Sequence, residues 1–122
     1  MNNFSADMKD IDVYEVQDVF LFEALLKYDE VMRGVGQRPK VRVIALEKIS
    51  YIDPTGLRCL KDFAQRCKNQ KIHLVLSGVN PLVLSAIKDF GICEFVNESC
   101  IFDNIEGAIQ KAEELKLAAV GY

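Results

Sequence analysis

Apolar and polar residues alternate along this chain in short segments, and the period of the alternation changes from one segment to the next. Residues 11–16 alternate with the two-residue period of a half-buried strand. Residues 19–22 form a short apolar run, where we expect a second strand joined to the first by a turn. The segments at 40–46 and 71–78 are rich in branched residues, a pattern typical of interior strands.

Four further segments carry apolar residues at the three- and four-residue spacing of helices, at 23–33, 57–67, 81–90 and 105–115. The third is expected to face the core through Leu82, Val83, Ala86, Ile87 and Phe90. Capping side chains precede three of the helices: Asp53, Asn80 and Asp103, the last with Glu106 at the capping-box spacing. A weak strand is expected near 94–96 or 100–102.

This order of elements is that of an α/β fold. It predicts a sheet of about four or five strands, mostly parallel, with a hairpin-like pair at the N-terminus and four flanking helices. We expect a single domain over residues 11–117, a tail or linker at 1–10 and a short tail at 118–122. In such folds the functional edge lies where strands end and helices begin.

Composition narrows the class of protein. The 122 residues are 50% hydrophobic, enough to bury a core without metals or disulfides. The net charge of −3 comes from 15 basic and 18 acidic residues that are interspersed, without the basic stripe that nucleic acid binding needs. The apolar runs are far shorter than the roughly 20 residues of a membrane span, so we predict neither a span nor a secretory signal.

Cysteine and histidine usage argues against metal chemistry. Cys59, Cys67, Cys93 and Cys100 lack the short spacings of zinc ligands, and His73 is the only histidine. We expect reduced, mostly buried cysteines in a cytoplasmic protein. We expect His73 to pack in or beside a strand.

The most informative stretch is IDPTGL at 52–57, between an interior strand and a helix. Asp53 suits the N-cap and Pro54 the first helical position, so capping explains both. Gly56 costs about 1 kcal/mol of helix propensity relative to alanine, which suggests close approach of another group. Thr55 has two open interpretations, as an ordinary first-turn residue or as a residue displayed for phosphorylation or anion contact.

An enzyme is not favoured. Neither G-x-G-x-x-G nor G-x-x-x-x-G-K-[ST] follows any predicted strand, so these nucleotide-binding modes lack support. Thr55 has no histidine near it in sequence, and Asp53 has no carboxylate partner for acid–base work. We expect no catalytic residue, cofactor or metal.

Together, the order of elements and the IDPTGL stretch resemble the STAS domain family over residues 11–115. The family hallmark is Asp-x-[Ser/Thr]-Gly-Leu at this strand-to-helix junction, matched by Asp53, Thr55, Gly56 and Leu57. The family includes bacterial anti-anti-sigma factors and the cytoplasmic part of SulP-type anion transporters. The stretches DVFLFEALLKYDEVM, VLSGVNPLVLSAIKDFGI and CIFDNIEGAI resemble the transporter branch.

The resemblance implies a non-catalytic regulatory and interaction module, the cytoplasmic domain of a SulP-type (sulfate-type) permease at the cytosolic face of the inner membrane. Its partner would be its own membrane domain or a cytosolic regulatory protein. The predicted partner-binding surface is formed by Asp53, Pro54, Thr55, Gly56, Leu57, Arg58, Asn80 and Pro81.

Two alternatives stay open. The chain could be a free-standing anti-anti-sigma factor, whose phosphorylated residue would fall on Thr55. It could also be a sensor that contacts a nucleotide or an anion at the same helix start.

Overall fold

The computed structural model describes residues 9–34 and 38–120. Three strands form one sheet: β1 (Ile11–Glu15), β2 (Val41–Ala45) and β3 (His73–Ser77). The α-helices are α1 (Glu23–Gly34), α2 (Pro54–Asn69), α3 (Pro81–Asp89) and α4 (Ile105–Val120). Three short 3-10 helices complete the order: η1 (Val19–Leu21), η2 (Ile92–Glu94) and η3 (Glu98–Cys100). The predicted α/β class and the four helices are confirmed.

The sheet differs from the prediction at its N-terminal side and in strand number. β1 pairs in parallel with the central strand β2, and β2 pairs in parallel with β3. The prediction of a second strand at 19–22 is wrong, because these residues form η1 and lead into α1. The expected late strand is reduced to one parallel bridge between Ile101 and Leu76. The described residues therefore contain three strands rather than four or five.

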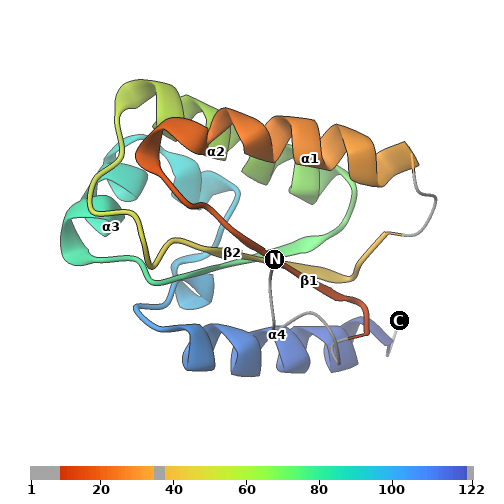
Figure 1. The fold of residues 1–122 in the computed structure, drawn as a ribbon. Helices are drawn as coiled ribbons and strands as arrows, with labels where there is room; N and C mark the ends of the chain where they lie inside the picture. The colour runs from red at the N-terminus through yellow and green to blue at the C-terminus, as the bar shows by residue number, and fades with distance from the viewer. Residues whose placement is uncertain (1–8, 35–37, 121–122) are drawn as a thin grey trace.

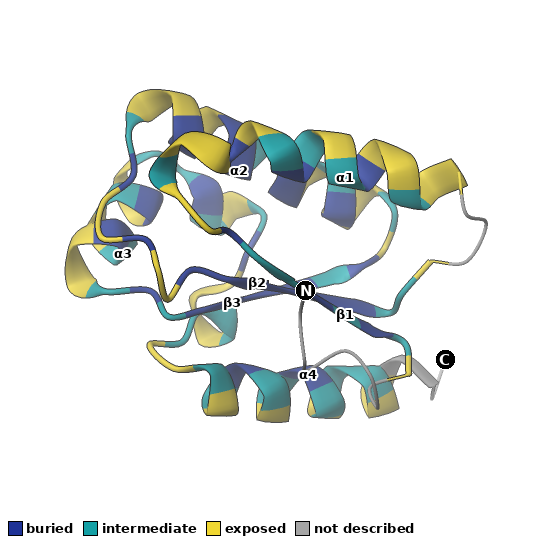
Figure 2. Ribbon diagram, viewed as in Figure 1, coloured by how far each residue is buried: buried dark blue, intermediate teal, exposed yellow. Residues whose placement is uncertain are grey.

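The two faces of the sheet are covered by different helices (Figure 1). α1 and α2 lie side by side over one face, and α4 lies along the other. Burial follows this layering, because the sheet and the inner sides of the helices are buried while the outer sides are exposed (Figure 2). On the α4 side of the sheet, Ala108 and Ala112 pack in one buried cluster with Val43 and Val75. The predicted stripe of the last helix is confirmed.

The core contains a buried ion pair that the sequence reading missed. Arg42 lies on the central strand and is 1% exposed, and Asp29 lies on α1 and is fully buried. Their side chains are 2.8 Å apart, and Gln70 donates a further hydrogen bond to Asp29 at 3.0 Å. The sequence does contain one signal of this pair, which is the position of Arg42 within an interior strand. A buried guanidinium requires an anionic partner, so a partner carboxylate could have been expected.

Two other local predictions are corrected. Leu82 was expected to face the core, but it is 65% exposed in the first turn of α3. The cap of α4 is Asn104, whose side chain accepts a hydrogen bond from the amide of Gly107 at 2.7 Å. Asp103, the predicted cap, lies one residue too early for this geometry. Asparagine and aspartate cap equally well, so sequence alone did not distinguish the neighbours.

Candidate functional site

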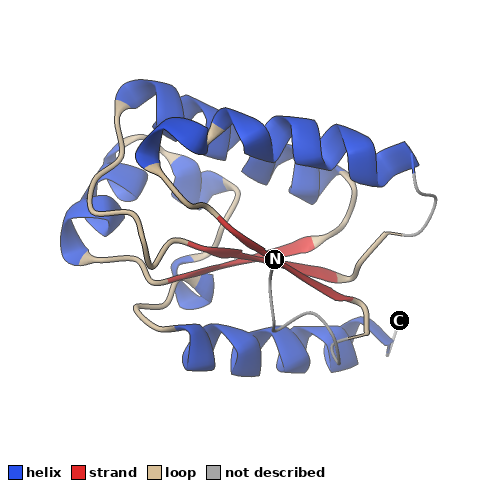
Figure 3. Ribbon diagram, in the orientation of Figure 1, coloured by secondary structure: helices blue, strands red, loops and turns tan. Residues whose placement is uncertain are grey.

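The carboxyl ends of the three strands lie at one edge of the sheet, because all three run parallel. Each strand leads there into a loop and then a helix: β1 into α1, β2 into α2 and β3 into α3 (Figure 3). This edge, which we call the carboxyl edge, carries the residues at 50–58 and 78–82. It is the edge at which open α/β sheets present their binding sites.

Hydrogen bonds join the two loops that were predicted to be neighbours. The side-chain amide of Asn80 donates to the carbonyl oxygen of Ser50 at 3.1 Å and to that of Ile49 at 3.4 Å. The other side of the same amide caps α3, since its oxygen accepts from the amide of Val83 at 2.8 Å. Asn80 therefore fixes the start of α3 relative to the loop that leads to α2.

A second contact between these loops starts at the end of β3. The hydroxyl of Ser77 donates to a carboxylate oxygen of Glu47 at 3.0 Å. Gly78 follows with a left-handed φ of 66°, and a Cβ there would lie 2.5 Å from the backbone nitrogen of Glu47. Only glycine allows this approach of the two loops.

The start of α2 has the predicted capping geometry. The carboxylate of Asp53 accepts a hydrogen bond from the amide of Gly56 at 2.7 Å, and Pro54 is the first helical residue. Pro54, Thr55 and Arg58 are exposed, whereas Gly56 and Leu57 are buried. The motif is therefore divided between an outward side, which holds Thr55, and an inward side that packs on the core.

Close packing explains Gly56. A Cβ built on it would lie 3.0 Å from Cδ2 of Phe22, 3.0 Å from Cγ1 of Ile52 and 3.1 Å from the capping oxygen of Asp53. Phe22 is itself 1% exposed and so has little room to move. The sequence indicated that some group lies close to Gly56. The structure shows that the close groups are side chains of this protein, chiefly that of Phe22.

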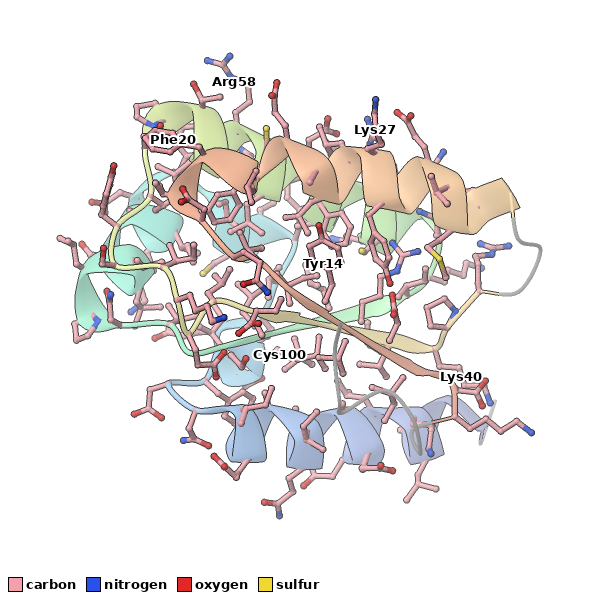
Figure 4. All side chains as sticks on the ribbon, viewed as in Figure 1. Tyr14, Phe20, Lys27, Lys40, Arg58 and Cys100 are labelled. Atoms are coloured by element: carbon pink, nitrogen blue, oxygen red, sulfur yellow. The ribbon has the colours of Figure 1, made fainter. Side chains whose placement is uncertain are left out.

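Exposed large apolar side chains gather at the same edge. Phe20 is 74% exposed on η1, Leu21 is its neighbour, Tyr51 lies in the loop before α2, and Leu82 starts α3. Figure 4 shows Phe20 and Arg58 together at this end of the molecule, away from Lys40. Phe22, two residues after Phe20, is 1% exposed and packs in the core. We call the four exposed residues Phe20, Leu21, Tyr51 and Leu82 the apolar rim.

Two strongly shifted pKa values belong to residues away from this edge, Cys67 and Tyr28. Burial raises the pKa of the Cys67 thiol to about 12, although nearby Arg42 opposes the rise. Burial and a hydrogen bond to Asp12 raise the pKa of Tyr28 above its ordinary value. Cys67 is buried on α2 and Tyr28 is half-buried on α1, and both lie beside Arg42 of the central strand.

Metal ligands are also not grouped. In the segments 9–34 and 38–120, no cluster of three His, Cys, Asp or Glu side chains could hold a metal ion. What the carboxyl edge offers is apolar surface, capped helix starts and an exposed threonine. This arrangement is suited to contact with another molecule more than to bond making.

The fold and the strand-to-helix motif are those of the STAS domain, and the family model of this domain matches residues 10–108. The chain belongs to the STAS domain family.

Its relatives include transporter domains. Over 68 residues it is 28% identical to a probable sulfate transporter 4.2 of Arabidopsis thaliana, a match that covers 56% of this chain and 10% of the transporter. The SulP transporter STAS domain of Vibrio cholerae is 25% identical with a TM-score of 0.85, covering 93% of this chain and 89% of that one. A sulfate transporter family protein of Wolinella succinogenes is 27% identical with a TM-score of 0.77, covering 91% and 93%.

The match thus spans only about a tenth of the length of the plant transporter. Within the described residues, none of the helices has both the length and the apolar character of a membrane span.

Proposed function

We propose that this chain is a non-catalytic regulatory and interaction module, the cytoplasmic STAS domain of a SulP-type anion permease. Its place would be the cytosolic face of the inner membrane, beside the membrane domain of the same transporter. The similarity to a SulP domain at 25% identity and TM-score 0.85 supports this choice over other members of the family. The partner is then its own membrane domain or a cytosolic protein that regulates transport.

The observation that carries the proposal is the apolar rim around the start of α2. Among the described residues, six large apolar side chains are exposed; four of them lie at the carboxyl edge, and Val31 and Leu117 lie elsewhere. Burying a large apolar side chain contributes about 1.5–3 kcal/mol, so covering the whole rim would contribute a large part of the free energy that must offset the association cost of about 4–15 kcal/mol. The capped starts of α2 and α3 hold this surface rigid, which limits the entropy lost on docking.

The partner-binding surface follows from exposure. Pro54, Thr55, Arg58 and Pro81 are exposed and would touch the partner directly. Asp53 and Asn80 position the two helix starts through their capping bonds. Gly56 and Leu57 would act from beneath by fixing α2 against the core.

Two measurements test the transporter assignment. The gene upstream of the Met1 codon should encode hydrophobic spans in the same frame. Removal of this segment from the complete protein should then change the rate of anion uptake or the abundance of the transporter in the membrane. An upstream stop codon, or uptake and abundance that are both unchanged, would overturn the proposal.

We further propose Thr55 as the position where charge regulates the contact. It is exposed in the first turn of α2, where helix amides favour a phosphoryl group and Asp53 opposes it. A phosphate adds about −1.5 to −2 charges to a surface that otherwise presents apolar groups. This is also the switch expected of an anti-anti-sigma factor, the alternative function. Phosphorylation of Thr55 by a cognate anti-sigma kinase, together with an upstream stop codon, would favour that alternative.

A further inference from the structure

A hollow of about 630 Å³ lies at the opposite edge of the sheet, where β2 and β3 begin. Its lining comes from the segment before β2, the end of α2, the start of β3 and the segment around η2 and η3. Lys40 and Cys100 both line it, and Figure 4 shows Lys40 at the end of the molecule away from Phe20 and Arg58. We call this hollow the amino-edge groove. It is separate from the surface that the proposed function uses.

The charges of the groove are of one sign. Among the residues that the structure describes, Arg38, Lys40, Lys68 and Lys71 line it, and no carboxylate does. A second hollow of about 540 Å³ shares Arg38 and Gln70 with it and adds Arg33 and Arg66, again without a carboxylate. Six of the 15 basic residues of a chain with net charge −3 therefore line these two hollows.

Part of this charge is already neutralised. Arg33 and Arg66 lie 2.9 and 3.6 Å from Asp29, and Lys40 lies 3.9 Å from Asp10. In the part of the chain that the structure describes, Arg38, Lys68 and Lys71 form no ion pair with a carboxylate. Cations near a helix C-terminus complement the helix dipole, which explains Arg66 and Lys68. Arg38 lies outside the helix but complements the same end, because its guanidinium donates to the carbonyl oxygen of the C-cap residue Gln70 at 3.0 Å. The helix dipole does not explain Lys40, which lies before β2.

Lys71 occupies an unfavourable backbone conformation. It follows the C-cap of α2 with a φ of 62°, in the left-handed region where glycine is preferred. The helix end is a Schellman motif, since the amide of Ile72 donates to the carbonyl of Cys67 at 2.9 Å and that of Lys71 to Lys68 at 3.0 Å. A lysine therefore stands where glycine would fold more easily, and it places a cation at the groove.

Much of the remaining lining is apolar. Ile72, Leu74, Phe95 and Val96 contribute to it, and the ammonium of Lys68 lies 5.7 Å from the centre of the Phe95 ring. His73 and Asn97 add polar groups. An apolar hollow of several hundred Å³ with a few converging polar groups is typical of a small-molecule site.

We propose that the amino-edge groove binds a small organic anion, with its phosphate or carboxylate group at Lys71 and Arg38 and its apolar part against Phe95 and Ile72. The charge of the lining selects an anion, and the apolar side chains select one with a ring or a short hydrocarbon group. This site is independent of the proposed function at the carboxyl edge, so either can fail without the other.

His73 gives a direct readout, because it is the only histidine of the chain and lines the groove. Phenyl phosphate should shift the imidazole proton signals of His73 in a saturable manner at millimolar concentrations. Benzyl alcohol lacks the charge-assisted bonds and inorganic phosphate lacks the buried ring, so each should bind at least about tenfold more weakly than phenyl phosphate.

Two substitutions separate binding from folding. Lys71→Gly and Lys71→Asn both suit a left-handed φ, so Tm should stay the same or rise while the affinity for phenyl phosphate falls about tenfold or more. Lys27→Gln removes the same charge from the exposed side of α1 and should leave the affinity unchanged.

Three results would overturn the proposal: no saturable shift of His73, equal affinity for inorganic phosphate and phenyl phosphate, or equal losses from Lys71→Gly and Lys27→Gln. Binding to vesicles of acidic phospholipid without binding of phenyl phosphate would also overturn it, because the groove would then be a membrane contact.

Discussion

The guanidinium of Arg42, on the central strand, and the carboxylate of Asp29, on α1, form a 2.8 Å ion pair that is closed off from solvent. The rings of Tyr28 and Phe63 lie 5.7 and 5.6 Å from the guanidinium carbon and cover the pair. α1 is thereby fixed to the sheet by a charged contact as well as by apolar packing. Since η1 leads directly into α1, the same contact helps to hold the apolar rim in place.

Replacing Asp29 with asparagine should strongly destabilise the fold. The substitution keeps the shape of the side chain but removes the close anion of buried Arg42 and leaves only Asp12, 3.8 Å from its Nε. Breaking a buried pair in this way costs about 3–5 kcal/mol. Urea unfolding measures the loss. Asp62→Asn is the matched control, because Asp62 pairs with Arg66 at 3.4 Å on the surface and should cost less than about 1 kcal/mol. Equal losses would contradict the role given to the buried pair.

The same pair predicts how stability depends on pH. Burial alone would raise the pKa of Asp29, but hydrogen bonds from Arg42 and Gln70 and the charge of Arg33 outweigh it and hold the pKa below its ordinary value. A carboxylate with a depressed pKa stabilises the fold above its unfolded pKa of about 3.9, and this contribution is lost as the pH falls through its folded pKa.

The free energy of unfolding of the wild type should therefore fall steeply in acid below about pH 4. The Asp29→Asn variant lacks the titrating group, so its stability should fall less over the same range. Urea titrations at a series of pH values compare the two slopes, and parallel curves would contradict the assignment.

Gly56 is predicted to resist substitution by alanine. Alanine would gain about 1 kcal/mol of helix propensity, but its Cβ would press on Phe22 and the Asp53 cap, and overpacking costs about 1–3 kcal/mol. The expected result is a net loss of about 1 kcal/mol in thermal or urea unfolding. Gly34→Ala serves as control, since outside its own helix no atom of the described residues lies within 4 Å of its added Cβ. This variant should be as stable as the wild type or more so. A stabilised Gly56→Ala variant would refute close packing as the reason for the glycine.

These contacts show what the sequence could and could not predict. The interior strands at 40–46 and 71–78 were predictable because branched apolar runs have few alternatives. The caps Asp53 and Asn80 were predictable because their acceptors stand directly before a proline that can start a helix. Residues 19–22 were misread because a four-residue apolar run has too few positions to distinguish a strand from a helical turn.

The candidate site was only partly predictable. The motif indicated where α2 begins and which loops meet there, but periodicity does not give the tilt of a short helix. Leu82 therefore faces outward although its spacing suggested the core. Phe20 and Phe22 are the same residue type, but Phe20 is exposed and Phe22 is buried. The difference depends on the path of the chain through η1, which the sequence pattern does not give. The Asp29–Arg42 pair joins residues 13 positions apart, and no local pattern connects them.

The apolar rim should contribute to function without contributing to stability. Phe20→Ser and Val31→Ser each remove a large exposed apolar side chain, 74% and 60% exposed, so each should change the free energy of unfolding by less than about 0.5 kcal/mol. Only Phe20 lies at the carboxyl edge. In the complete protein, Phe20→Ser should alter anion uptake and Val31→Ser should not. Equal effects on uptake would show that the rim is not the docking surface.

The most direct test of the proposed docking edge is crosslinking from position 55 in the native host. A photoreactive amino acid at Thr55, which is exposed at the start of α2, should form crosslinks to a peptide of the transporter membrane domain, identified by mass spectrometry. The same group at Lys27, exposed on α1, should form few or none. Equal yields from the two positions, or crosslinks from position 55 to an anti-sigma kinase instead, would contradict the transporter-docking account.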